Sequence, residues 1–140
     1  MRNSKPILLV EDDTVDVMTV RRALKDIQVT SELVATGDGE QALAYLRDDR
    51  NEKPCVILLD LNMPKMNGTE FMRIVKADEA LRRIPIIVLT TSKSDQDISK
   101  SFELGAAGYM LKSVDYKKFT QIIKTVDLYW TLSKLPSNGG

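Results

Sequence analysis

The chain has 140 residues, the length of a single domain whose core is large enough to fold without disulfides or a structural metal. Lys plus Arg and Asp plus Glu number 20 each, so the chain has no net charge that would attract nucleic acid or an anionic membrane. It contains no histidine and one cysteine, Cys55, which excludes the usual histidine metal sites, histidine-containing catalytic triads and an internal disulfide.

No apolar run approaches the roughly 20 residues of a membrane span, and the N-terminal stretch MRNSKPILLVEDD becomes acidic too early for a signal peptide. We therefore expect a cytoplasmic protein with no membrane partner and no nucleic-acid partner. Any catalysis has to use carboxylates, lysines or hydroxyl groups.

Five short aliphatic runs alternate with amphipathic stretches along the chain. The runs are PILLV, ELVA, CVILL, IPIIVL and GYML, at residues 6–10, 32–35, 55–59, 84–89 and 108–111. Three of them lack the period-two alternation of apolar and polar residues, which indicates strands that are covered on both faces, as in a parallel sheet.

The amphipathic stretches predict five helices, which start near residue 14, after 38, after 68, after 94 and near 115, the last ending near 131. Their apolar residues are Val17, Val20, Leu24 and Ile27; Ala42, Leu43 and Leu46; Phe71, Met72 and Val75; Ile98, Phe102 and Leu104; and Phe119, Ile122, Ile123, Val126 and Trp130. The predicted caps are Asp13 for the first helix, and the capping-box pairs Asp38 with Gln41 and Ser94 with Asp97 for the second and fourth. Gly105 is the predicted end of the fourth helix.

The alternation predicts an α/β fold, a doubly wound (βα)5 sandwich with a flavodoxin-like parallel five-stranded sheet in the order 2-1-3-4-5. We expect one domain over residues 1–140, with its core at about 5–127 and a C-terminal helix extension and frayed tail at 128–140.

Polar residues follow the ends of four predicted strands: Glu11-Asp12-Asp13, Asp60, Thr90-Thr91-Ser92 and Lys112-Ser113. In such sheets ligands bind beyond the carboxyl ends of the strands. If strands one and three are neighbours, Glu11, Asp12 and Asp60 meet at one rim. Two carboxylates about 4 Å apart repel by about 4 kcal/mol at an effective dielectric constant of 20, so a cation has to lie there.

Mg²⁺ fits this cluster because it takes oxygen ligands, typically one or two carboxylates with waters and phosphate oxygens. Lys112 can extend its ammonium across the rim, and Thr90 adds a hydroxyl donor. Such a site suits a phosphoryl group held on a carboxylate, because Asp is a covalent nucleophile and the metal neutralises the transferring oxygens. Asp60 is central and is the predicted acceptor.

The ordered motifs VEDD, LLDLNMPKMNG, VLTTS and GAAGYMLK resemble those of the receiver domains of bacterial two-component response regulators, over about residues 5–127. The resemblance implies that Asp60 accepts a phosphoryl group from a phosphohistidine of a sensor histidine kinase. It implies Mg²⁺ ligands at Glu11, Asp12, Asp60 and the backbone carbonyl of Asn62.

The same resemblance implies roles for residues around the acceptor. Thr90 and Lys112 would hold the phosphoryl group, and Thr90 and Tyr109 would form a switch that reshapes the surface of the fourth helix, fifth strand and fifth helix. Asn62 and Ser92 would influence slow self-dephosphorylation. The family usually has a cis Lys-Pro bond after the fifth strand, whereas this chain has Lys112-Ser113, where a cis bond costs about 2.5–4 kcal/mol, and either isomer stays open.

The Lys-Ser pair and the C-terminal LYWTLSKLP are similar to single-domain receivers that partner bacterial phytochrome-type kinases, which implies a regulator without a DNA-binding output domain. Homodimerisation through the last helix and tail is predicted from the apolar residues Tyr129, Trp130, Leu132 and Leu135. The alternative is that Trp130 closes the protein's own core.

Three other functions stay open. An Asp-nucleophile phosphohydrolase commonly needs a second Asp two residues on, where this chain has Asn62. A nucleotide- or flavin-binding module is disfavoured because no glycine-rich phosphate loop follows the first strand and Glu11-Asp12 would repel a phosphate. A degenerate receiver used only for docking is disfavoured by the intact acidic pair, Asp60 and Lys112. Taken singly, each residue also has a structural explanation, such as a helix N-terminal charge for Glu11, and only their coincidence at one rim favours a site.

Overall fold

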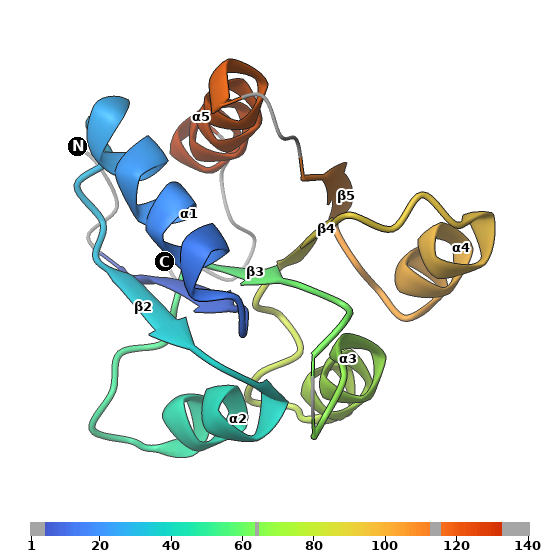
Figure 1. Ribbon diagram of the computed structural model, residues 1–140. Helices are drawn as coiled ribbons and strands as arrows, with labels where there is room; N and C mark the ends of the chain where they lie inside the picture. Colours follow the sequence, from blue (N-terminus) through green and yellow to red (C-terminus); the bar gives the residue numbers. More distant parts are fainter. Residues whose placement is uncertain (1–4, 64, 113–115, 133–140) are drawn as a thin grey trace.

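The computed structural model describes residues 5–63, 65–112 and 116–132, with side chains described as far as residue 125 (Figure 1). Strands and helices alternate along the described chain. In order they are β1 (Ile7–Val10), α1 (Thr14–Asp26), β2 (Leu33–Thr36), α2 (Gly39–Arg47), β3 (Val56–Leu59), α3 (Gly68–Ala77), β4 (Ile86–Thr90), α4 (Asp95–Glu103), β5 (Gly108–Leu111) and α5 (Tyr116–Leu132).

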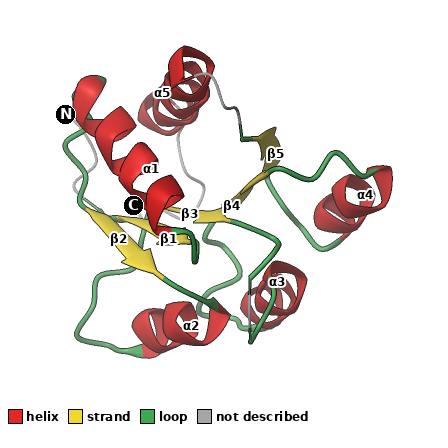
Figure 2. Ribbon diagram, in the orientation of Figure 1, coloured by secondary structure: helices red, strands yellow, loops and turns green. Residues whose placement is uncertain are grey.

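The strands form one parallel sheet in the order β2-β1-β3-β4-β5, which confirms the predicted flavodoxin-like topology. The register pairs Ile7 of β1 with Leu33 of β2 and with Val56 of β3. Figure 2 shows the twisted sheet between two layers of helices, with α1 and α5 on one face and α2 and α3 on the other. In the described residues no helix is long and apolar enough to span a membrane.

Both faces of the sheet are buried, which explains why the strands are uniformly apolar rather than alternating. Successive strand residues point to opposite faces, so β1 contributes Leu8 and Val10 to one core cluster and Ile7 and Leu9 to the other. The first cluster includes Leu43, Leu46, Phe71, Met72 and Val75 from α2 and α3, and the second includes Val20, Ala23, Leu24, Phe119 and Ile123 from α1 and α5.

The predicted helix caps are partly confirmed. The Asp13 carboxylate accepts from the backbone N–H groups of Val15 and Asp16, and Gly105 ends α4 in the left-handed conformation at φ +103°. Asp38 and Ser94 also cap their helices, through the N–H groups of Gln41 and Asp97. The predicted return contact of each capping box, from the side chain of Gln41 or Asp97 to the backbone N–H of the capping residue, is wrong. The Gln41 side chain instead accepts from the Gly37 N–H, and the Asp97 carboxylate accepts from the Ser92 hydroxyl.

The expected apolar stripe of α4 is also wrong in one residue, because Phe102 is 50% exposed and Ser101 is the buried residue of this helix. The physical reason is the position of α4 beside the edge strand β5, where there is less sheet to cover than beneath α2 or α3. The start of the last helix near Asp115, the side chains of Val126 and Trp130, and the peptide bond between Lys112 and Ser113 lie outside the described residues.

Gly68, at the start of α3, allows this helix to lie directly against the end of β3. A Cβ atom there would meet the Asp60 carbonyl oxygen and the Leu61 Cα, both at 2.7 Å. The Gly68 N–H donates to the Leu61 carbonyl at 3.0 Å. The glycine therefore determines how closely α3 approaches the backbone that carries Asp60.

Candidate functional site

Backbone hydrogen bonds place the polar residues after the strands at one edge of the sheet. The Asp60 N–H donates to the Val10 carbonyl at 3.0 Å, and the Lys112 N–H donates to the Thr90 carbonyl at 2.8 Å. The Glu11 N–H is held in the same way by the Thr36 carbonyl at 2.9 Å. The hydrogen bonding between the strands thus continues to Glu11, Asp60 and Lys112, one residue beyond each strand.

Three carboxylates meet at this edge. Oxygen atoms of Glu11, Asp12 and Asp60 all lie within 4.8 Å of one another. Glu11 and Asp60 are 4% and 7% exposed, whereas Asp12 faces solvent. Hard oxygen ligands at this spacing, two of them shielded from water, match the ligand preference of Mg²⁺ and of similar divalent cations.

The Lys112 ammonium lies among these acidic groups. Its Nζ is 2.5 Å from Glu11 Oε1, 2.8 Å from Asp16 Oδ2 and 3.6 Å from Asp60 Oδ2, and the lysine side chain is only 11% exposed. The structure therefore brings Glu11, Asp60 and Lys112 together, as the strand order led us to expect. Asp16 was not anticipated. Its position in the first turn of α1 is readable from the sequence, but the direction of its carboxylate toward the end of β5 is not.

The crowding changes the proton affinity of two of these groups. Burial raises the pKa of the Glu11 carboxyl from 4.5 to about 7; the negative charge of Asp60 adds to the rise, and Lys112 opposes it. Burial also lowers the pKa of Lys112, but its hydrogen bonds to Asp16 and Glu11 and the charges of Glu11 and Asp60 outweigh that effect. The pKa of Lys112 is therefore raised overall, and the side chain stays a cation.

Thr90, Ser92 and Tyr109 form a second connected group beside the carboxylates. Thr90 is fully buried, and its Oγ1 accepts from the Ser92 N–H at 3.4 Å. The Tyr109 hydroxyl donates to the Ser92 carbonyl at 2.9 Å, and the Ser92 hydroxyl donates to Asp97 Oδ2 at 2.5 Å. Ser92 thus links the end of β4 to Tyr109 on β5 and to Asp97 at the start of α4.

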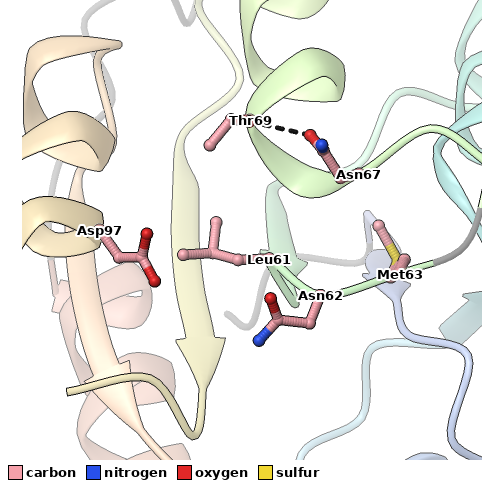
Figure 3. Close-up of a pocket in the computed structure, with 6 residues that line it drawn as sticks. All are labelled: Leu61, Asn62, Met63, Asn67, Thr69 and Asp97. Atoms are coloured by element: carbon pink, nitrogen blue, oxygen red, sulfur yellow. Dashed lines mark hydrogen bonds between the residues drawn. The ribbon is translucent and has the colours of Figure 1, made fainter. Parts of the chain in front are cut away.

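Asn62 follows Asp60 by two residues, and its N–H donates to Asp60 Oδ1 at 3.3 Å. It borders an open pocket of about 390 Å³ between the β3–α3 loop and α4 (Figure 3). Figure 3 shows the Asp97 carboxylate directed toward Leu61 across this pocket, with the Asn67 side chain bonded to the Thr69 hydroxyl at 2.8 Å. The pocket leaves room for solvent next to the loop that follows Asp60.

Residues 7–124 match the response regulator receiver domain. The chain belongs to this family. The receiver domain is 37% identical over 130 residues to the response regulator Rcp1 of Synechocystis sp.. The aligned region covers 90% of this chain and 88% of Rcp1. It is a signalling domain, and this family match disfavours both the Asp-nucleophile phosphohydrolase and the nucleotide- or flavin-binding module.

The chain is also similar to solved structures of response regulators. The phosphorylated cyanobacterial phytochrome response regulator RcpA has a TM-score of 0.89 at 39% identity, covering 96% of this chain and 100% of that one. The Mn²⁺-bound form of response regulator Rcp1 has a TM-score of 0.86 at 36% identity, covering 95% and 99%. A divalent metal on a relative agrees with the acidic cluster described above.

The raised pKa of Glu11 predicts a pH-dependent stability in metal-free buffer. Because the pKa is about 7 in the folded state and 4.5 unfolded, protonated Glu11 stabilises the fold below pH 4.5, and this contribution is lost as the pH rises to about 7. Glu11→Gln does not titrate. As the pH rises from about 5 to about 8, we expect the unfolding free energy of wild type to fall by about 1–3 kcal/mol relative to that of Glu11→Gln.

Urea denaturation with chelator across this pH range measures the effect. The matched control is Glu79→Gln, at an exposed position in the turn that follows α3. A stability difference between Glu11→Gln and wild type that stays constant with pH would contradict the prediction.

Proposed function

We propose that Asp60 accepts a phosphoryl group from a phosphohistidine of a sensor histidine kinase in a Mg²⁺-dependent reaction. The observation that carries the proposal is the cluster of Glu11, Asp12 and Asp60 with the Lys112 ammonium at the carboxyl edge of the sheet. A carboxylate so placed is a nucleophile surrounded by groups that stabilise charge on a phosphoryl group.

In the proposed step, an Asp60 carboxylate oxygen attacks phosphorus while the phosphorus–nitrogen bond of the phosphohistidine breaks. The electron pair of that bond returns to the imidazole, and the phosphoryl group becomes an acyl phosphate on Asp60. Glu11, Asp12, Asp60 and the Asn62 carbonyl would hold Mg²⁺, which supplies neutralisation of the phosphoryl oxygens. Lys112 and the Thr90 hydroxyl would donate to those oxygens once the group is attached.

The switch proposal rests on the connection between Thr90, Ser92 and Tyr109. A phosphoryl group on Asp60 would draw the Thr90 hydroxyl toward its oxygens and so disturb the contact of Thr90 with the Ser92 N–H. Tyr109, which is bonded to the Ser92 carbonyl, would then change position. The surface of α4, β5 and α5 would carry this change to a partner.

Reversal of the signal is proposed as slow hydrolysis of the acyl phosphate by water. Asn62 is exposed and bonded to Asp60, and Ser92 lies near Thr90 at the end of β4, so both are placed to influence the approach of water. Since the Ser92 hydroxyl is already bonded to Asp97, its influence would depend on that contact.

The partner is proposed to be a phytochrome-type histidine kinase in the cytoplasm. This rests on the similarity to RcpA, a phytochrome response regulator, and to Rcp1, and on the structure of the bacteriophytochrome response regulator AtBRR at 36% identity. Homodimerisation is proposed from the apolar C-terminal sequence that includes Trp130.

Asp60→Asn is expected to abolish phosphorylation, because an amide is not a nucleophile toward phosphorus. Wild type incubated with an acyl phosphate and Mg²⁺ should gain the mass of one phosphoryl group, read by intact-protein mass spectrometry. Asp49→Asn, at an exposed position in the loop before β3, is the matched control and should behave as wild type. Phosphorylation of Asp60→Asn at the wild-type rate would refute the acceptor.

Thr90→Ala is expected to weaken the coupling between phosphorylation and Tyr109. The coupling should fall by about 1–2 kcal/mol, so the shift in the Tyr109 equilibrium becomes about five to thirty times smaller. Tyr109 ring signals in NMR spectra, recorded before and after phosphorylation, measure it. Thr91→Ala, at the exposed neighbouring position, is the control. A full shift of the Tyr109 signals in Thr90→Ala would show that the hydroxyl is not the link.

Truncation after Asp127 tests the proposed dimer. It removes Tyr129, Trp130, Leu132 and Leu135 together, and we expect the chain to sediment as a monomer at concentrations where the full chain is a dimer. Circular dichroism checks that the shortened chain folds. If the truncated chain and the full chain have the same oligomeric state, residues after Asp127 have no role in dimerisation.

A further inference from the structure

Lys112 is bound more closely by two other carboxylates than by the proposed acceptor. Its Nζ is within hydrogen-bond distance of Glu11 and of Asp16, whereas Asp60 Oδ2 is 3.6 Å away. A lysine ammonium has three donors and one charge, so each carboxylate that engages it reduces its hold on the others. The position of the ammonium is therefore a balance between opposing acidic neighbours.

Asp16 differs from the other two carboxylates in its location. It lies in the first turn of α1, where the Asp13 carboxylate fixes the helix start through the Val15 and Asp16 N–H groups. Its side chain is 37% exposed, against 3% for Glu11, and among the described residues it does not belong to the group of three that could hold a metal. Asp16 thus engages Lys112 from outside the metal cluster.

The two closer partners of Lys112 differ in their relation to the group of three carboxylates. Glu11 is shared between Lys112 and the metal cluster, so a metal there competes for the same carboxylate. Asp16 is not shared in this way, and it can keep the ammonium at the border of the site. Without Asp16, the full charge of Lys112 would act on Glu11 and Asp60, which are the groups that a cation needs.

We propose that Asp16 is a positioning residue that draws the Lys112 ammonium aside and so keeps Glu11 and Asp60 available to a divalent cation. The inference deepens the proposed function, on which it rests for the identity of the metal. It assigns no contact with phosphorus to Asp16. Its effect on the metal passes entirely through Lys112.

The test compares Asp16→Asn with Asp13→Asn by isothermal titration calorimetry with Mg²⁺ alone. Each variant removes one negative charge from the start of α1, and asparagine at residue 13 still caps the helix because its side-chain oxygen accepts the same N–H groups. We expect Asp16→Asn to bind Mg²⁺ about fivefold more weakly than Asp13→Asn, the size expected for one partly exposed ion pair.

The same two substitutions are then made in a Lys112→Met background. If Asp16 acts through the ammonium, the fivefold difference disappears there and only the common effect of losing one charge remains. Circular dichroism checks folding, and Lys112→Gln repeats the measurement with a polar side chain if Lys112→Met does not fold.

Equal affinities of Asp16→Asn and Asp13→Asn in the wild-type background would overturn the inference, and so would a difference that persists without Lys112. Failure of the wild-type chain to bind Mg²⁺ would overturn it as well. A wild type that binds Mg²⁺ but takes no phosphoryl group would instead overturn the role of Asp60 as acceptor and leave that of Asp16 intact.

Discussion

The site depends on one cation shared among carboxylates at the edge of a buried sheet. Lys112 reaches back from the end of β5 to Glu11 and Asp16 and lies 3.6 Å from Asp60. Two of these carboxylates are almost fully shielded from water, where an unpaired negative charge is costly. The lysine offsets part of that cost, and the high pKa of Glu11 shows that the compensation is incomplete. The remaining negative charge is what suits the cluster to a divalent cation.

The rest of the fold serves to hold these charges in place. Since both faces of the sheet are covered by helices, a shift of a strand by one residue would move each of its side chains into the opposite core, where it would not fit the helices packed there. Register therefore fixes where β1, β3 and β5 end, and the residues that follow these strands, Glu11, Asp60 and Lys112, lie together at one edge of the sheet. Gly68 adds a local constraint, because only a residue without Cβ lets α3 lie so close to the Asp60 carbonyl.

The differences between expectation and structure have specific causes. The N-caps at Asp13, Asp38 and Ser94 were predictable because each acts within one helical turn. The return contacts of the Gln41 and Asp97 side chains to the capping residues were not predictable, because these side chains accept from the Gly37 N–H and the Ser92 hydroxyl instead. Phe102 has an apolar side chain at a suitable spacing, yet α4 beside the edge strand leaves it exposed.

The sequence by itself determined the alternation of strands and helices, the receiver-domain motifs and the position of Asp60 directly after a buried strand, because these depend on periodicity and on residue types at fixed local spacing. The tertiary structure alone decided which carboxylates share the lysine. Glu11 and Lys112 are 101 positions apart and Asp16 and Lys112 are 96 apart, and a contact at such separation follows from strand order and helix placement, not from any local pattern. Asp16 was missed for that reason.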